Sequence, residues 1–151
     1  APGQLSLFPQ LNCHIIHNLS DPAVAAYFLN AEPEDLLMDM NTFGLLFESL
    51  VIRDLRVYVE AQGGKVYHYR DSDGLEADAI MHLKGRWAAA EVKLGSSEGV
   101  EEGVRNLKRL KEKVDDTYRN KLAFLVVITA HGYAYRRDDG VYVVPIGCLR
   151  P

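Results

Sequence analysis

The sequence predicts an α/β domain with a mixed β-sheet flanked by helices, in the order helix, three strands, helix, strand. Three observations lead to this prediction. A long segment with the spacing of an amphipathic helix ends at Gly63-Gly64. Three β-like runs follow it and are separated by short turn sequences. A second amphipathic segment then leads into an apolar run, as expected where a helix covers a sheet and returns the chain to it.

Residues 1–41 are expected to be a lead-in with two short helices, which joins a domain absent from this chain. Asp21-Pro22 is typical of a helix start, and Glu32-Pro33 opens a second helix over Leu36–Met40. The chain begins with Ala-Pro rather than Met, so we expect it to be processed or to be part of a longer protein.

Residues 42–151 are expected to form the folded domain. Asn41 or Thr42 caps the long helix, which runs from Phe43 to about Gln62. Ser96 or Ser97 caps the second helix, which continues to about Asp115 with one apolar stripe (Val100, Val104, Leu107, Leu110 and Val114). Strands are expected at Lys65–Arg70, Leu75–Leu83, Arg86–Leu94 and Leu122–Ala130, and a closing β-hairpin at Tyr133–Arg137 and Val141–Pro145.

Length and composition agree with one globular domain. The chain has 151 residues, of which 48% are hydrophobic and 25% are charged, so collagen-like repeats and disorder are excluded. Its two cysteines, Cys13 and Cys148, are far apart, which favours reduced thiols over a disulfide scaffold. The apolar run at 122–130 is too short to span a bilayer, and the N-terminus lacks the basic start of a secretory signal. We therefore expect a cytoplasmic protein without a membrane partner.

Charge is distributed unevenly along the chain. The formal net charge is −4, but residues 1–52 contain six acids and no Lys or Arg. All 17 basic residues and the other 15 acids lie in residues 53–151. The net charge therefore does not exclude a polyanionic partner such as DNA.

Glu48 lies in the middle of an apolar stripe on the long helix (Leu45, Val51, Ile52, Leu55 and Val59). A carboxylate in such a place costs free energy unless it is paired or bound to a cation. One interpretation is a functional acid. The alternative is a Glu that reaches solvent or meets a structural Arg.

The strand sequences predict a second group of acids. A two-residue turn at Lys84-Gly85 would place Asp78 opposite Glu91, and Glu76 opposite Lys93, on one face of the sheet. Like charges directly opposite each other destabilise a sheet, so the Asp78–Glu91 pair needs a proton or a cation. The other face alternates small and apolar residues and is expected to be the core, which leaves the acidic face for solvent or ligand. Trp87 alternates onto the acidic face, where packing is the commoner role of an aromatic residue and base stacking is the alternative. An exposed face of mixed charges is the alternative.

These side chains suit metal-assisted hydrolysis of phosphodiester bonds. Asp78, Glu91 and the backbone carbonyl of Val92 offer hard oxygen ligands for Mg²⁺ or Mn²⁺, and Glu48 would complete the shell directly or through water. Such an ion would polarise the scissile phosphate and lower the pKa of an attacking water. Lys93 would orient that water or neutralise developing charge.

Glu48, Glu76-Ala77-Asp78 and Glu91-Val92-Lys93 together resemble the PD-(D/E)XK nuclease superfamily, which has a restriction-endonuclease-like αβββαβ core. The resemblance covers about residues 20–130 and implies that Asp78, Glu91 and Lys93 are the catalytic trio and Glu48 the helix acid. Ala77 stands where many members have Pro.

Five segments of the sequence resemble a prokaryotic family of uncharacterised domains that lie C-terminal to AAA-type P-loop ATPase domains. The segments are Asp21–Ala26, Gly44–Glu48, His68–Arg70, Gly74–Asp78 and Glu91–Lys93. The resemblance implies an ATPase domain in the parent chain. No G-x-x-x-x-G-K-[ST] phosphate loop occurs in these 151 residues.

Basic residues of the second helix are candidates for binding the DNA backbone. Arg105, Lys108 and Lys111 lie there, and Arg70 would add to a basic rim. A solvated helix face is the commoner interpretation of such a run. His14-x-x-His17 is expected to be a pair in a loop rather than a metal site.

Two functions are therefore expected from the sequence. The first is a metal-dependent nuclease that acts on DNA rather than RNA and forms the C-terminal part of an ATPase. The second is a catalytically silent module of the nuclease fold, which binds DNA or protein and targets or regulates an AAA-type ATPase.

Overall fold

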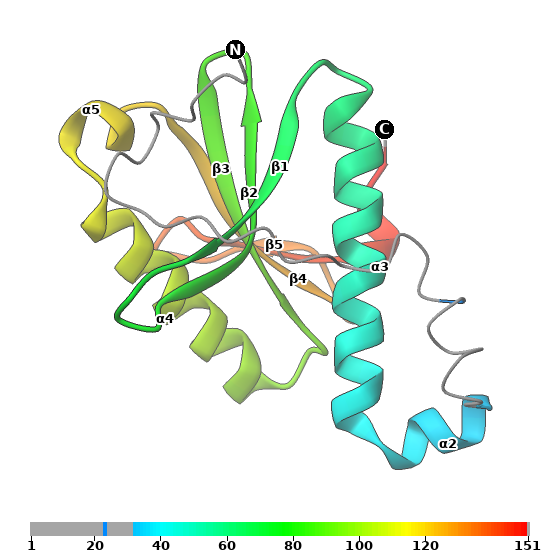
Figure 1. Ribbon diagram of the computed structural model, residues 1–151. Helices are drawn as coiled ribbons and strands as arrows, with labels where there is room; N and C mark the ends of the chain where they lie inside the picture. Colours follow the sequence, from blue (N-terminus) through cyan, green and yellow to red (C-terminus); the bar gives the residue numbers. More distant parts are fainter. Residues whose placement is uncertain (1–22, 24–31, 151) are drawn as a thin grey trace.

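The computed structural model describes Ala23 and residues 32–150. A single six-stranded sheet in the order β1-β2-β3-β4-β6-β5 forms its centre (Figure 1). The elements are α2 (Pro33–Met38), α3 (Met40–Glu60), β1 (Lys65–Arg70), β2 (Glu76–Leu83), β3 (Arg86–Lys93), α4 (Ser97–Lys113), α5 (Asp116–Arg119), β4 (Leu122–Thr129), β5 (Tyr135–Arg136), β6 (Tyr142–Pro145) and a 3₁₀ helix (Ile146–Cys148). The predicted helix that begins at Asp21-Pro22, Cys13 and the His14–His17 pair lie outside the described residues.

The sheet is mixed, as the sequence predicts. Strands β1, β2 and β3 form an antiparallel meander, whereas β3, β4 and β6 run parallel to one another. A parallel neighbour requires a crossover, which α4 and α5 supply between β3 and β4. Strands β5 and β6 form the predicted C-terminal hairpin. The predicted mixed α/β fold, with helices flanking the sheet, is therefore confirmed.

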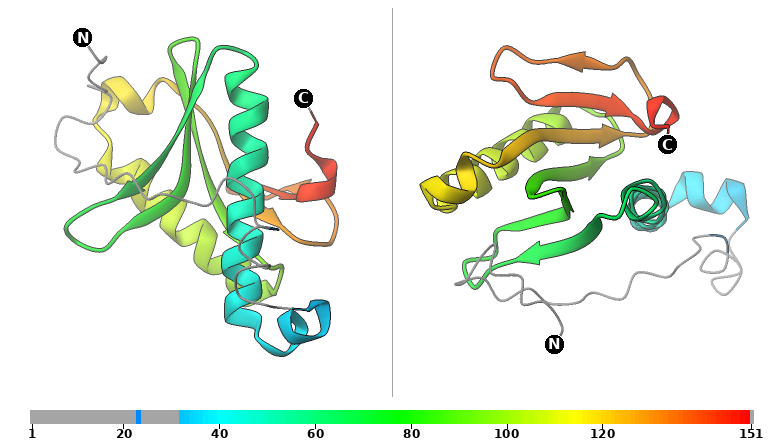
Figure 2. Two further views of the ribbon diagram at one scale, coloured as in Figure 1. Left: turned by 45° about the vertical axis from the view of Figure 1, so that its right-hand side comes forward. Right: turned by 90° about the horizontal axis from the view of Figure 1, so that it is seen from above.

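Helices cover both faces of the sheet. Helix α3 packs against β1, β2 and β3 on one face, and α4 packs against β2, β3 and β4 on the other (Figure 2). Two hydrophobic clusters result, one under each helix. The cleft described below lies where residues of α3, the β2–β3 pair and α4 approach one another.

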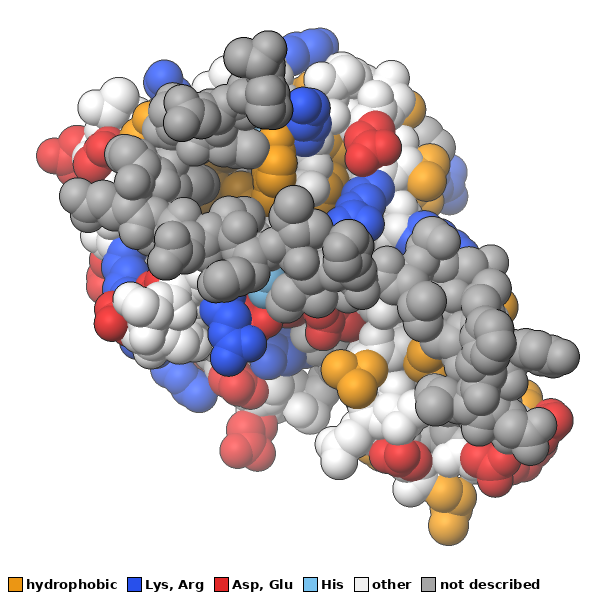
Figure 3. Space-filling view, viewed as in Figure 1, with side chains coloured by type: hydrophobic (Ala, Val, Ile, Leu, Met, Phe, Trp, Pro, Cys, Tyr) orange, Lys and Arg blue, Asp and Glu red, His pale blue; other side chains and the backbone are white. Residues whose placement is uncertain are grey.

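The surface of the described region carries interspersed charges. On the face shown in Figure 3, basic side chains are scattered among acidic ones rather than forming one large basic patch, and the lower right of the view carries acidic side chains without basic ones. Several large apolar side chains near the start of α3 are exposed, including Leu37, Met38 and Leu45. None of the helices in the described part of the chain is long and apolar enough to cross a membrane.

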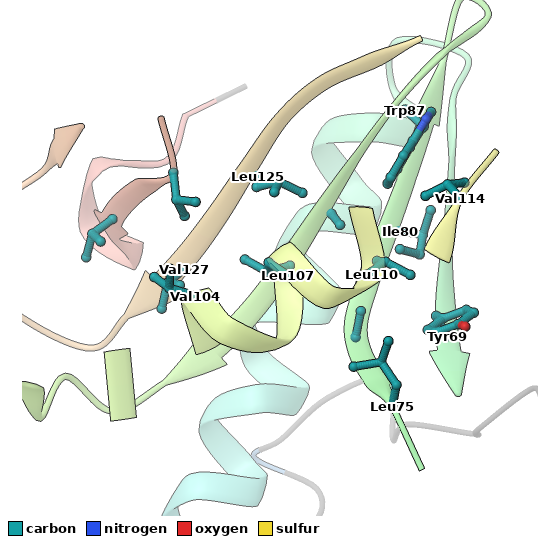
Figure 4. Packing of buried hydrophobic residues seen from close by; sticks show 14 of the residues in the cluster. Tyr69, Leu75, Ile80, Trp87, Val104, Leu107, Leu110, Val114, Leu125 and Val127 are labelled. Carbon is teal, nitrogen blue, oxygen red and sulfur yellow. The ribbon is translucent and has the colours of Figure 1, made fainter. Parts of the chain in front are cut away.

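Helix α4 covers the acid-bearing face of β2 and β3, so the expectation that only the other face is core is wrong. Ile80, Trp87 and Ala89 are buried under the apolar stripe of α4, whose Leu107 and Leu110 lie over the sheet in Figure 4. The Trp87 indole N–H donates a hydrogen bond to the Tyr118 carbonyl at 2.7 Å. The strand pattern alone is insufficient here because the partner of this face is a helix distant in sequence.

The β2–β3 hairpin has the predicted register. Lys84 and Gly85 both have positive φ angles, 51° and 76°, as a two-residue type I′ turn requires. Leu83 pairs with Arg86, and the same register continues to Ala79 and Ala90. Glycine is suited to the second turn position because it adopts positive φ without strain. This local turn places the acidic ends of β2 and β3 side by side.

The ends of some elements differ from the predictions. Asp39 is the N-cap of α3, instead of Asn41 or Thr42, because its carboxylate accepts the Thr42 N–H at 3.2 Å and the Thr42 hydroxyl at 2.6 Å. The predicted Ser96 cap of α4 is confirmed by its hydrogen bond from the Gly99 N–H. Strand β5 is shorter than predicted, with two residues in the ladder.

Candidate functional site

A cleft of about 360 Å³ opens between α3, the β2–β3 pair and α4. Five carboxylates line it, those of Glu48, Glu76, Asp78, Glu91 and Glu102. Its basic residues are Lys93 and Arg109, and the rest of its lining is Gly74, Leu75, Val92 and Asn106. All four residues that the sequence predicts as catalytic, Glu48, Asp78, Glu91 and Lys93, therefore meet in one cleft.

Asp78 and Glu91 lie at the end of the β2–β3 ladder. The last ladder pair is Ala79 with Ala90, and the same register places Asp78 opposite Glu91 at the next position. There the Asp78 carboxylate accepts a hydrogen bond from the Val92 N–H at 2.7 Å. A side chain thus takes the N–H that would otherwise bond to the β2 backbone.

The hydrogen bond to Asp78 also orients Val92. In a strand, the N–H and C=O of one residue point toward the same neighbouring strand. Since the Val92 N–H points toward Asp78, its carbonyl is directed to the same side. The predicted third oxygen ligand therefore lies on the β2 side of β3, where Asp78 is.

Glu91 is almost fully buried, with 3% of its surface exposed. Burial, and then the nearby charge of Asp78, raise the pKa of Glu91 well above its usual range. Lys93 and a hydrogen bond donated by the Asn106 side chain oppose this rise. Burial likewise raises the pKa of Asp78, against the hydrogen bond from Val92 and the charge of Lys93. The pair is thus a site where negative charge lacks full compensation.

Glu48 reaches the cleft from α3. Its residue is half-buried, and burial followed by the charges of Asp78 and Glu76 raises the pKa of Glu48 to about 7. No Lys or Arg within residues 32–150 forms an ion pair with it. Within these residues the structure therefore does not show the alternative interpretation, in which Glu48 pairs with a structural Arg. Leu45, predicted in the same apolar stripe, is 67% exposed, so the buried stripe is narrower than predicted.

Lys93 is the basic residue that forms ion pairs with carboxylates of the cleft. Its Nζ lies 3.8 Å from Glu91 Oε2 and 3.4 Å from Glu102 Oε2. Its side chain is 22% exposed, whereas that of Glu102 is 55% exposed. Lys93 therefore lies between one buried acid and one acid at the rim of the cleft.

Glu76 pairs with a residue that sequence reasoning missed. Its Oε1 lies 2.9 Å from the Nε2 of His68, instead of bonding to Lys93 as the register predicts. His68 is at a register irregularity in β1, between Tyr67 and Tyr69, and its side chain is only 8% exposed. A bulge shifts side chains between faces, so the sequence period could not place His68.

Three residues of α4 were also missed as part of the site. Glu102, Asn106 and Arg109 are spaced i, i+4 and i+7, which puts them on one edge of the helix. That edge faces the cleft, next to the buried stripe. Their spacing could have been noticed in the sequence, but nothing local shows which sheet edge α4 lies over.

The predicted nucleic-acid-binding residues are not in the lining of the cleft. Lys108 forms an ion pair with Asp139 of the C-terminal hairpin at 2.8 Å. Arg70, Arg105 and Lys111 are exposed elsewhere on the described surface. Their role in binding DNA stays a prediction, whereas the basic side chain that α4 directs to the cleft is Arg109.

The donor set of the cleft is made of oxygens. In the described region, no three His, Cys, Asp or Glu side chains are arranged as a ready-made metal site. Register places the Asp78 and Glu91 carboxylates opposite each other, and the Val92 carbonyl is directed to the β2 side of β3. Mg²⁺ commonly binds through one or two carboxylates and keeps several waters, so this smaller donor set fits it. The uncompensated charge of the acid pair fits a cation in the same way.

The fold and the cleft define a mixed α/β domain whose sheet end carries a buried acid pair and a lysine. Residues 43–149, which include the whole cleft, match a family described as "Domain of unknown function (DUF4143)". The chain belongs to this family. No curated protein of established description matches the chain.

Proposed function

We propose that this domain is a metal-dependent nuclease that hydrolyses phosphodiester bonds in DNA. The observation that carries the proposal is the buried Asp78–Glu91 pair with Lys93 in an open cleft. Burying two facing carboxylates costs free energy, and a structural role alone would be served better by apolar residues. Raised carboxyl pKa values in a cleft are typical of functional sites.

The residues present fit Mg²⁺ or Mn²⁺ as the cofactor. Asp78, Glu91 and the Val92 carbonyl would hold the ion, and Glu48 would act through a water, since three acids do not converge as a ready-made site. When bound, the ion supplies a Lewis acid for the phosphodiester and lowers the pKa of water. Lys93 stabilises negative charge that develops on the phosphate. The Val92 N–H holds the Asp78 carboxylate in place.

The order of the elements supports the same proposal. An αβββαβ core with acids on the first helix and the second strand, and Glu-x-Lys on the third, is the arrangement of the PD-(D/E)XK superfamily. The sequence segments around these acids resemble domains C-terminal to AAA-type ATPase domains. We accordingly propose a cytoplasmic parent protein in which this domain follows an ATPase.

A second candidate is a catalytically silent module that binds a partner for its ATPase. The charge of the cleft favours it, because five carboxylates face two basic groups. The interspersed surface charges in Figure 3 also differ from the basic stripe of many DNA-binding domains. The enzyme proposal differs in requiring a divalent cation before DNA can enter.

Metal titration and a cleavage assay test these proposals. Calorimetric titration of Mn²⁺ should show binding to the wild type that is lost in Asp78→Asn. Plasmid and single-stranded DNA should be cut in the presence of Mn²⁺, with at least about 100-fold slower cutting by Glu91→Gln. The control is Glu112→Gln, which removes an exposed carboxylate of α4 outside the cleft.

Each outcome separates the two candidates. Metal binding and cutting that both depend on the cleft acids support the nuclease. Equal metal binding by the wild type and Asp78→Asn contradicts the metal site. DNA binding without cutting, unchanged in Glu91→Gln, supports the silent module.

A further inference from the structure

The two edges of α4 have different partners. On one edge, Lys108 pairs with Asp139 and Glu101 pairs with Arg137, which ties the helix to the C-terminal hairpin. The other edge faces the cleft. Because both edges belong to one rigid helix, the ion pairs on the hairpin side fix which residues α4 presents to the cleft.

The first two residues on the cleft edge are already engaged with the acid site. Glu102 pairs with Lys93 at 3.4 Å, and Asn106 donates a hydrogen bond to Glu91. Gly103 directly follows Glu102, and a Cβ there would be 3.3 Å from the Glu91 Cβ. Helix α4 therefore lies directly against the strand that carries the site.

Arg109, the third residue on this edge, differs from its basic neighbours. Lys93 lies between two carboxylates, and Lys113, one turn further along α4, is held by Asp71 and Asp73. Arg109 is exposed, lines the cleft, and forms no ion pair with any of residues 32–150. Arg109 is thus a permanent positive charge at the rim of an acidic cleft. Its charge is available to a ligand.

We infer that Arg109 binds a phosphate group of the substrate strand and makes the cleft edge of α4 the substrate-facing wall of the site. A guanidinium presents a planar set of donors that matches phosphate oxygens and keeps its charge at any physiological pH. An anion that approaches five carboxylates needs such a fixed charge near the entrance. The inference rests on the proposed function, since the ligand is taken to be a nucleic-acid phosphodiester.

Binding of DNA, measured separately from cleavage, tests this inference. The full chain is titrated into a short fluorescent duplex in Mg²⁺, and anisotropy is followed over a series of salt concentrations. Arg109→Ala should weaken binding about tenfold and reduce the slope of log affinity against log salt by about one. Arg109→Lys should recover part of the affinity, because the charge returns without the planar donor set.

The matched control is Arg150→Ala, which removes the same charge from an exposed arginine outside the cleft lining. It should change the affinity less than twofold. Equal losses in Arg109→Ala and Arg150→Ala, or no DNA binding by the wild type, would overturn the inference. The melting temperature of Arg109→Ala should stay at the wild-type value, because the side chain is exposed and makes no ion pair in the described region.

The nuclease proposal and this inference fail separately. Arg109-dependent DNA binding without any cutting would contradict the nuclease and support the phosphate site. Cutting with an unchanged KM in Arg109→Ala would support the nuclease and contradict the phosphate site.

Discussion

Two acidic regions near the start of β2 differ in how their charge is compensated. In the turn before β2, the Asp71 carboxylate accepts hydrogen bonds from Lys113 Nζ at 2.6 Å and from the Tyr69 hydroxyl at 3.0 Å. The N–H groups of Asp73 and Leu75 add two more at 2.9 Å. Burial alone would raise the pKa of Asp71, but these hydrogen bonds lower it to about 2. This group, the Asp71 cluster, ties α4 to the β1–β2 turn.

Asp78 follows Asp71 by seven residues, and its pair with Glu91 of β3 has the opposite character. Asp78 accepts one backbone N–H, and burial raises the pKa of both acids. The comparison shows that burial of a carboxylate does not by itself identify a functional site. What distinguishes the cleft is burial without enough donors, which leaves the site dependent on a proton or a cation.

The largest expected contrast is in folding stability. Asp71→Ala should lower the free energy of unfolding by about 2–3 kcal/mol, because it leaves Lys113, the Tyr69 hydroxyl and two N–H groups without their acceptor. Glu91→Gln should leave this free energy unchanged or raise it at pH 8 without metal. The folded wild type must take up a proton at this carboxyl or bury its charge, because burial raises the pKa of Glu91, and a neutral amide needs neither. Urea unfolding of both variants measures the contrast. A large loss of stability in Glu91→Gln would mean that the cleft is structural.

The pH dependence of stability should have a different sign in the two regions. For Glu48 the pKa is near 7 in the folded chain and 4.5 ordinarily, so the folded state holds more protons between these values. Stability without metal should therefore rise as pH falls from about 7 toward 4.5. The pKa of Asp71 is lowered from 3.8 to about 2, so its contribution is complete above 3.8 and is lost as pH falls toward 2.

Urea unfolding at a series of pH values measures this profile. Glu48→Gln should flatten the slope between pH 5 and 7, and Asp71→Asn should flatten the loss below pH 4. The assignment of uncompensated charge to the cleft would be contradicted if the metal-free wild type became more stable as the pH was raised from 5 to 7.

The smallest expected effect concerns Glu102 at the rim of the cleft. Glu102→Gln removes one of the two carboxylates near Lys93 and should change stability by less than about 0.5 kcal/mol, because more than half of the Glu102 side chain is exposed to solvent. Cleavage should change by only a few-fold, since Lys93 keeps its contact with Glu91. A loss as large as that of Glu91→Gln would place Glu102 among the residues that hold the metal or the substrate.

Local features of the chain were predictable because short-range geometry controls them. The Lys84-Gly85 turn determines the register of β2 and β3, which places Asp78 opposite Glu91 before any long-range contact is known. The apolar stripe of α4 and its Ser96 cap were predictable for the same reason. Asp39 was missed as the cap of α3 because neighbouring polar residues compete for that role.

The sequence by itself therefore determined the order of the elements, the acids of β2 and β3, and the Glu48 side chain that meets them. Only the tertiary structure decided that α4 covers the acid-bearing face, that His68 pairs with Glu76 across an irregular β1, and that Arg109 rather than Lys108 faces the cleft. The physical reason is distance along the chain. Turns and helix stripes depend on residues a few positions apart, whereas the surroundings of a carboxylate depend on which distant element packs against it.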